Sequence, residues 1–148
     1  MGKHRLAKVK VKINGQVTTA VLDTGASAAF MSTQEAQRLG LTANSKDTTT
    51  YLSISVASGT TAGSCLACID LGGATVSVKL WLVDNPSMPI LLPTPLLEKW
   101  GAILDMRNGS VDLTALGKRL TFMQEPNLNH AFSVAVDTNI FMEQRDTE

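Results

Sequence analysis

The sequence has few cysteines, no long hydrophobic run and no excess charge of either sign. Two cysteines in 148 residues do not make a disulfide framework. The 13 Lys and Arg residues balance the 13 Asp and Glu residues, so no overall field attracts nucleic acid or an acidic membrane surface. The longest apolar stretches are broken by proline and fall far short of the roughly 20 residues of a membrane-spanning helix. We therefore expect no nucleic-acid partner and no membrane partner.

The beginning of the chain also lacks the features of a secretory leader. Met1 is followed by Gly2-Lys3-His4-Arg5 and then by an alternating segment, where a leader has an apolar core. We expect a protein that is not secreted. A length of 148 residues fits one domain, within the usual range of roughly 100–200 residues.

Metal-binding residues are sparse and poorly arranged. Cys65 and Cys68 lie three positions apart, but no second ligand pair accompanies them, and residues three apart on a strand point to opposite faces. His4 and His130 have no neighbouring ligands in the sequence. We predict no metal site and no cofactor.

What the chain does contain is alternation of period two around turn-forming pairs. Lys8 to Ile13 and Gln16 to Leu22 flank Asn14-Gly15, which favours a type I′ turn because both central residues need positive φ. Three further segments repeat the pattern: Ile54 to Thr61 around Ser58-Gly59, Leu66 to Leu80 around Gly72-Gly73, and Ile103 to Leu113 around Asn108-Gly109. The sequence therefore predicts a mostly antiparallel β domain.

Two short helices interrupt the predicted strands. Ser32-Thr33-Gln34-Glu35 has the form of a capping box, and Gly40 ends the helix that it starts. A second helix runs from Pro95 to Gly101, with proline in the first turn, where a backbone N–H has no partner. Both helices follow an apolar strand and an irregular loop, a weak repeat of the kind that two duplicated half-domains would leave.

One acidic side chain stands at the end of the second predicted strand. In Val21-Leu22-Asp23-Thr24-Gly25-Ala26-Ser27 a carboxylate is followed at once by a hydroxyl, a glycine and small residues, which suits a carboxylate held in a tight loop. Attack of water on an amide needs one carboxylate to take a proton while another supplies one. Because the loop occurs once, the second carboxylate has to come from a second copy of the chain.

These features, in this order, resemble the retropepsins, the dimeric aspartic proteases of retroviruses and LTR retrotransposons, from about Val9 to about Leu113. The resemblance implies a mostly β fold: a closed or semi-open β-barrel with a β-hairpin flap and one or two short helices, assembled as a homodimer. It implies a protease domain over residues 1–120, with 121–148 as a C-terminal extension, linker or additional strand. It also implies a location in the cytoplasm or within a virus-like particle.

The resemblance assigns roles to particular residues. Asp23 would be catalytic, and Thr24 and Gly25 would complete the active-site loop, with the Thr24 hydroxyl bracing the loop of the partner. The residues implied to bind substrate are Ala26, Ser27, Ser58 and Gly59. The implied reaction is cleavage of extended peptide segments, as in polyprotein processing, by water activated between two Asp23 carboxylates that share a proton.

Two departures from the family stand out. Pro93-Thr94-Pro95 follows Leu91-Leu92, where the family usually has glycine before its last helix. The acidic residue that several viral members place near Ser27, and its arginine partner near Thr94, are both missing. The altered segment keeps open a second interpretation: a catalytically weak or inactive retropepsin-fold dimerisation or binding domain, domesticated or of the ubiquitin-shuttle type.

A different enzyme class also places Asp-x-Gly after a strand, in the first phosphate loop of actin-like and sugar-kinase ATPases. That fold needs a much longer chain and normally continues directly into a hairpin. Here a helix start at Ser32 follows the loop instead.

Overall fold

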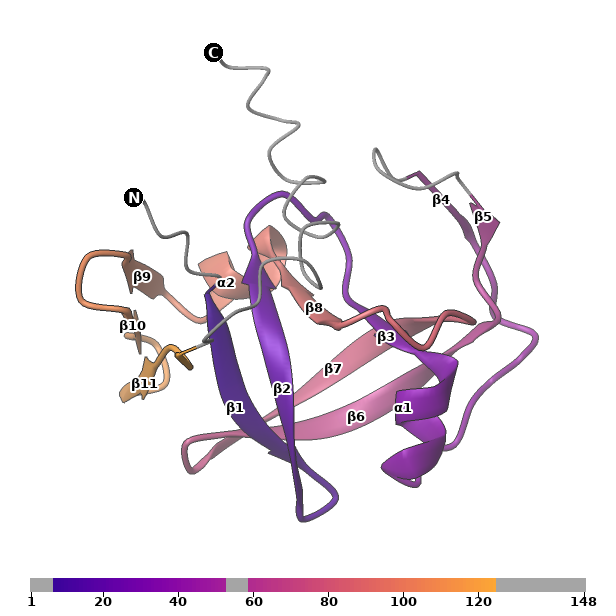
Figure 1. The fold of residues 1–148 in the computed structure, drawn as a ribbon, viewed down its shortest axis with the longest axis horizontal. Coiled ribbons are helices and arrows are strands. Elements are labelled where there is room, and N and C mark those ends of the chain that lie inside the picture. Colours follow the sequence, from indigo (N-terminus) through magenta and orange to yellow (C-terminus); the bar gives the residue numbers. More distant parts are fainter. Residues whose placement is uncertain (1–6, 53–58, 125–148) are drawn as a thin grey trace.

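The computed structural model describes residues 7–52 and 59–124, and its centre is a closed barrel of six strands (Figure 1). The strands follow one another around the barrel in the order β1-β2-β8-β3-β7-β6. Their bounds are β1 (Lys8–Ile13), β2 (Gln16–Asp23), β3 (Phe30–Ser32), β6 (Gly63–Leu71), β7 (Ala74–Val83) and β8 (Ile90–Pro93). The mostly β barrel expected from the sequence is confirmed.

Local turn chemistry sets the two long hairpins of the barrel. Asn14 and Gly15 join β1 to β2 with φ of 53° and 75°, as a type I′ turn requires. Gly72 and Gly73 join β6 to β7 in the same left-handed region. Along β1 the apolar side chains are buried while Lys10 and Lys12 are exposed, so the alternation in the sequence becomes an inner and an outer face.

Two parallel and two antiparallel pairings close the rest of the barrel; the antiparallel ones join β3 to β8 and β1 to β6. β2 pairs with β8 so that Asp23 lies opposite Pro93, and β3 pairs with β7 so that Phe30 lies opposite Trp81. Apolar side chains from all six strands fill the interior. The largest fully buried ones on these strands are Ile13, Met31, Ile69, Leu71, Leu80, Leu82 and Leu92, and Leu39 after α1 and Leu113 outside the barrel join the same core cluster. The described residues contain no helix with the length and apolar character to cross a membrane.

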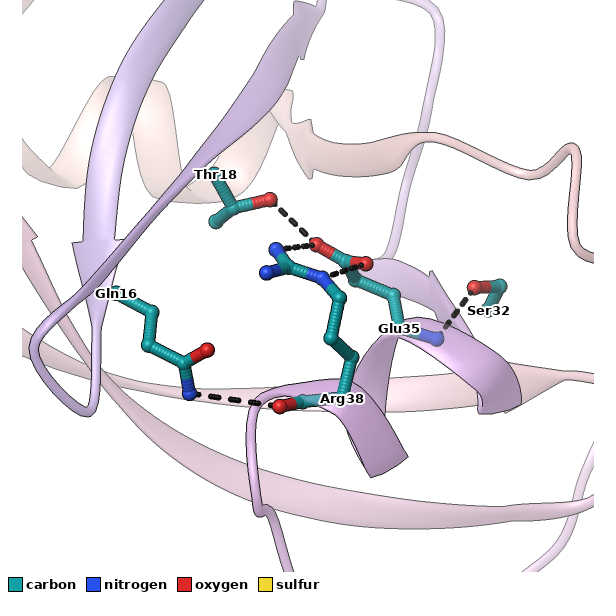
Figure 2. A network of polar contacts seen from close by, with 5 residues as sticks. All are labelled: Gln16, Thr18, Ser32, Glu35 and Arg38. Atoms are coloured by element: carbon teal, nitrogen blue, oxygen red, sulfur yellow. Dashed lines mark hydrogen bonds and ion pairs between the residues drawn. The ribbon is translucent and has the colours of Figure 1, made fainter.

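Helix α1 (Thr33–Arg38) begins at the predicted Ser32 cap, where Ser32 Oγ accepts a hydrogen bond of 2.9 Å from the N–H of Glu35. Only this half of the predicted capping box forms. The Glu35 carboxylate instead accepts hydrogen bonds from Arg38 and from the Thr18 hydroxyl on β2 (Figure 2). Gln16 adds a hydrogen bond to the Arg38 carbonyl, so polar contacts join the helix to β2.

Helix α2 (Thr94–Lys99) begins one residue earlier than predicted, at Thr94. It leads through Gly101 into a three-stranded sheet of order β11-β10-β9, formed by β9 (Ala102–Asp105), β10 (Ser110–Leu113) and β11 (Lys118–Thr121). The hairpin of β9 and β10 was predicted, whereas β11 was not. Phe122 belongs to the buried core, two residues beyond the expected domain end at 120.

A small hairpin of β4 (Thr50–Tyr51) and β5 (Gly59–Thr60) projects away from the barrel (Figure 1). The prediction that Ser58-Gly59 forms its turn is wrong for Gly59, which pairs with Tyr51 inside the ladder. A Cβ atom at Gly59 would lie 3.1 Å from the Tyr51 hydroxyl, so the glycine allows close side-chain contact rather than a turn. Ser58 and the segment 53–57 lie outside the described residues.

Candidate active site

Asp23 is the last residue of β2 and one of the few buried polar side chains in the described chain, with 5% of its surface exposed. The apolar strand carries the residue to the end of the barrel, and its pairing with Pro93 fixes that end against β8. The chain then leaves the sheet, and Thr24, Gly25 and Ser27 are exposed. A carboxyl group is therefore held at the base of a solvent-facing loop.

Two hydrogen bonds shape the turn that follows Asp23. The Gly25 N–H donates to Asp23 Oδ1 at 2.9 Å, and the Ala26 N–H donates to the Asp23 carbonyl at 3.1 Å. Burial raises the pKa of Asp23 above its ordinary value, and the Gly25 N–H opposes that rise by stabilising the charged form. The net direction is upward, so this carboxyl retains a proton at a pH where an exposed aspartate has lost it.

The raised pKa has no contribution from another acidic group of the same chain, because burial and the Gly25 N–H are its causes. A single described chain thus supplies one protonatable carboxyl at this site. General acid–base chemistry with paired carboxylates needs a second group from elsewhere.

The first residue of α2 is hydrogen-bonded to the loop that follows Asp23. The Thr94 hydroxyl donates to the Thr24 carbonyl at 2.7 Å, and the Thr94 N–H donates to the Ala26 carbonyl at 3.2 Å. The segment Pro93-Thr94-Pro95, which departs from the family pattern, is therefore in direct contact with the loop that carries Asp23.

The structure brings the contiguous predicted residues together at the loop after Asp23. Thr24, Gly25 and Ala26 take part in the hydrogen bonds around Asp23, whereas Ser27 is exposed beside them. Gly59 lies in β5, where its described partner is Tyr51. Ser58 lies outside the described residues.

A row of apolar side chains beside Asp23 escaped the sequence analysis. Adjacent strands pair Val21 with Leu91, Leu91 with Phe30, and Phe30 with Trp81. None of the four belongs to the main core cluster; Phe30, Trp81 and Leu91 are half-buried, whereas Val21 is buried. Val21 and Asp23 are two positions apart on β2 and share a face of the sheet. We call these four residues the outer apolar row. The signal was present in the alternation along β2, β7 and β8, but an apolar residue on an outer face has the same sequence pattern as one in the core.

The small hairpin contacts the outer apolar row through Tyr51, and the segment before the hairpin is tied to a neighbour of the row through Asp47 and Lys79. The Tyr51 ring packs edge-on against Phe30, with ring centroids 6.0 Å apart. Lys79 Nζ lies 4.3 Å from the centre of the Trp81 ring and forms a 2.7 Å ion pair with Asp47. The hairpin and the segment before it are thereby held next to the face that carries Asp23.

Elsewhere in the described residues, no group of three or more His, Cys, Asp or Glu side chains could hold a metal ion. Cys65 is buried and Cys68 is exposed, as expected for two residues on opposite faces of β6. The arrangement near Asp23 suits proton transfer by a carboxyl group next to an apolar surface.

Comparison with known proteins supports this interpretation. The family model described as aspartyl protease matches residues 9–96, which include the Asp23 loop and the start of α2. The fold is similar to the retroviral protease-like domain of Ddi1 from Leishmania major, with a TM-score of 0.65 and 16% identity over 86% of this chain and 99% of that one. It is also similar to EIAV protease complexed with the inhibitor HBY-793, with a TM-score of 0.51 and 22% identity over 69% of this chain and 94% of that one. No curated protein sequence matches the chain.

Proposed function

The chain belongs to the aspartyl protease family and has a retropepsin-like fold, and from that premise we propose that it is a homodimeric endopeptidase. The observation that carries the proposal is the buried Asp23 carboxyl, held by the Gly25 N–H and raised in pKa by burial. The closed barrel differs from the fold that an actin-like ATPase requires, so the phosphate-loop interpretation is set aside.

The proposed reaction uses one Asp23 from each of two chains. The two carboxyl groups share a proton, and the ionised one takes a proton from water while the oxygen of that water attacks the peptide carbonyl carbon. The protonated one hydrogen-bonds the carbonyl oxygen and then supplies the proton that the leaving nitrogen takes as the C–N bond breaks. Burial supports the assignment of one protonated and one ionised carboxyl group, because it favours the protonated form of Asp23.

Two surfaces support a second copy of the chain as the partner. Thr24 is exposed next to Asp23, where its hydroxyl can brace the loop of a partner. Among the described residues, strand β9 lies at the edge of its three-stranded sheet; Ile103 on this strand and Met106 just after it are 60% and 52% exposed. A sheet edge with exposed apolar side chains is a typical place for another chain to pack.

The outer apolar row supports an extended peptide as the substrate. A peptide laid across the face beside Asp23 places alternate side chains on Leu91, Phe30 or Trp81 and pairs its backbone, as an added strand, with the hairpin of β4 and β5. The hairpin of β4 and β5 would then act as the flap above it, with Tyr51 on the substrate side. We expect a preference for hydrophobic or aromatic side chains at the cleaved bond and a natural role in polyprotein processing.

The test is cleavage of a peptide library at about pH 4–6.5, where a shared proton is retained. The wild-type chain should cut in a pepstatin-sensitive manner, and Asp23→Asn should cut nothing while keeping the dimer. Asp84→Asn is the matched control, because Asp84 is exposed and its described contact is with Gln34. Pepstatin-sensitive cleavage by Asp23→Asn would contradict the proposal.

A second candidate is a non-enzymatic dimeric binding domain with the same fold. The similarity to a domain described as retroviral protease-like, together with the unusual Pro93-Thr94-Pro95 segment, favours keeping it. A wild-type chain that is dimeric in solution, yet cuts no member of the library, would support this candidate over the protease.

A further inference from the structure

Thr94 is the single residue that ties helix α2 to the loop after Asp23 through two described hydrogen bonds. Its hydroxyl donates a hydrogen bond to the Thr24 carbonyl at 2.7 Å, and its N–H donates one to the Ala26 carbonyl at 3.2 Å. These two carbonyls flank Gly25, whose own N–H reaches Asp23 Oδ1 at 2.9 Å. The Thr24 carbonyl belongs to the same peptide unit as the Gly25 N–H, and the Ala26 carbonyl belongs to the unit between Ala26 and Ser27. Thr94 therefore holds the peptide unit that contacts the carboxyl group, together with a second unit farther along the loop.

The neighbours of Thr94 explain why this one residue carries the contact. Pro93 and Pro95 have no backbone N–H and no side-chain donor, so Thr94 is the one residue of the three that can donate to the loop. The prolines also fix their own φ and thus limit the conformations of the segment. Pro93 lies opposite Asp23 in the parallel ladder, so the support is anchored to the same strand end as the carboxyl group.

We propose that Thr94 is a positioning residue for the Asp23 carboxyl, acting through the Thr24 carbonyl and the Gly25 N–H. The inference rests on the proposed protease function and adds to it a residue that touches neither water nor peptide. Without the hydroxyl, the Thr24 peptide unit is free to rotate and the Gly25 N–H leaves its alignment with Oδ1. Since that N–H lowers the pKa of Asp23, its loss raises the pKa further and misplaces the carboxyl relative to its mate.

The chain offers a matched control at the opposite end of the same helix. The Thr114 hydroxyl donates to the Gly101 carbonyl at 2.7 Å, the same bond type and length as the bond from Thr94 to Thr24. Gly101 directly follows the C-cap of α2, whereas Thr94 begins the helix next to the loop. Valine at either position removes the hydroxyl and nearly preserves the shape of the side chain.

The experiment compares Thr94→Val, Thr94→Ser and Thr114→Val with the wild-type chain. We expect kcat of Thr94→Val to fall about three- to tenfold, the worth of one neutral hydrogen bond expressed as a rate, with KM within about twofold. The acidic limb of its pH–rate profile should move to higher pH. Thr94→Ser should retain wild-type kcat and pH profile, and so should Thr114→Val. Unchanged kcat and pH profile in Thr94→Val would overturn the inference, as would an equal loss in Thr114→Val.

A second measurement tests the positioning role of Thr94 without relying on activity. It applies even if the wild-type chain cuts no peptide, a result that would count against the proposed function and not against the role of Thr94. NMR titration of the Asp23 carboxyl carbon should give a higher pKa in Thr94→Val than in the wild type or Thr114→Val, at a pH where thermal unfolding shows every variant folded. Identical Asp23 titrations in Thr94→Val and the wild type would overturn the positioning role.

Discussion

Glu35 provides a stability prediction whose size follows from its contacts. Its carboxylate accepts a 2.6 Å hydrogen bond from the Thr18 hydroxyl, which is mostly buried, and two hydrogen bonds from the more exposed Arg38 (Figure 2). Glu35→Gln keeps the shape and can still accept from Thr18. The substitution replaces a hydrogen bond to a charged acceptor, which contributes roughly 1.5–3 kcal/mol to stability, by one to a neutral acceptor, which contributes roughly 0.5–1.5 kcal/mol.

The exposed pair with Arg38 adds about 0.3–0.5 kcal/mol, because solvent screens it. We therefore expect Glu35→Gln to lower the free energy of unfolding by about 1.5 kcal/mol at pH 7, a fall in Tm of about 3–6 °C for a domain of this size. Urea unfolding followed by circular dichroism measures the first quantity, and a thermal scan measures the second.

The pH dependence gives the prediction its sign. Hydrogen bonding to Arg38 lowers the pKa of Glu35, burial opposes that effect, and the Thr18 hydroxyl lowers it further, with a net fall below the ordinary value. A carboxyl with a depressed folded pKa stabilises the protein fully above its unfolded pKa and loses that contribution as the pH falls through the folded pKa. The difference between wild type and Glu35→Gln should therefore persist at the mildly acidic pH of the proposed reaction and vanish at lower pH.

A double-mutant cycle isolates the contact between the helix and β2. Thr18→Val removes the donor, so the penalty of Glu35→Gln should shrink to the small contribution of Arg38 in that background. A penalty that is the same in both backgrounds, or that stays constant from pH 7 to pH 3, would refute this account of the network.

Three further predictions follow from single positions. Asp23→Asn should raise the stability at pH 7, because burial penalises the charged carboxyl, and the gain should shrink as the pH falls through the raised pKa and the wild type takes up a proton; a gain that grows on acidification contradicts this. Gly117→Ala should lower the free energy of unfolding by about 1 kcal/mol, because its φ is +66° and a Cβ there meets nothing within 4 Å. Gly101→Ala should lower it by more, because φ is the same but a Cβ at Gly101 meets the Thr114 hydroxyl. Urea unfolding with equal penalties would be the opposing result. Cys68 should react with a thiol reagent in the folded protein well before Cys65, which is buried and has a raised thiol pKa; equal rates by mass spectrometry would exclude that difference.

Features set by neighbouring residues were predictable from the sequence. The turns at Asn14-Gly15 and Gly72-Gly73 depend on which residues accept positive φ, and both hairpins formed where the alternation predicted them. The Asp23 loop was found in the same way, because a carboxylate followed by small residues is a local pattern. The Ser32 cap was also local, and its serine half formed as predicted.

Features set by distant partners were not predictable. Gly59 reads as a turn residue, yet its place in the ladder with Tyr51 depends on a strand that alternation did not reveal. The Glu35 carboxylate does not form the expected capping-box hydrogen bond, because it accepts one from the hydroxyl of Thr18 on β2 instead. The outer apolar row exists because β8 pairs with β2 in parallel and with β3 in antiparallel, which sets Leu91 next to both Val21 and Phe30. Periodicity gives the face of each residue but not the strand that comes to lie beside it.

The central claim is that two chains each supply one Asp23 to a single site, and subunit mixing tests it most directly. A fixed amount of wild-type chain is allowed to re-equilibrate with increasing amounts of Asp23→Asn chain, and peptide cleavage is measured. If activity needs both carboxyls, about a ninefold excess of Asp23→Asn should leave about one tenth of the original activity, because most wild-type chains then sit in mixed dimers. Equal addition of Asp84→Asn chain should cause no loss. Activity that stays constant through the whole titration with Asp23→Asn would contradict a shared site.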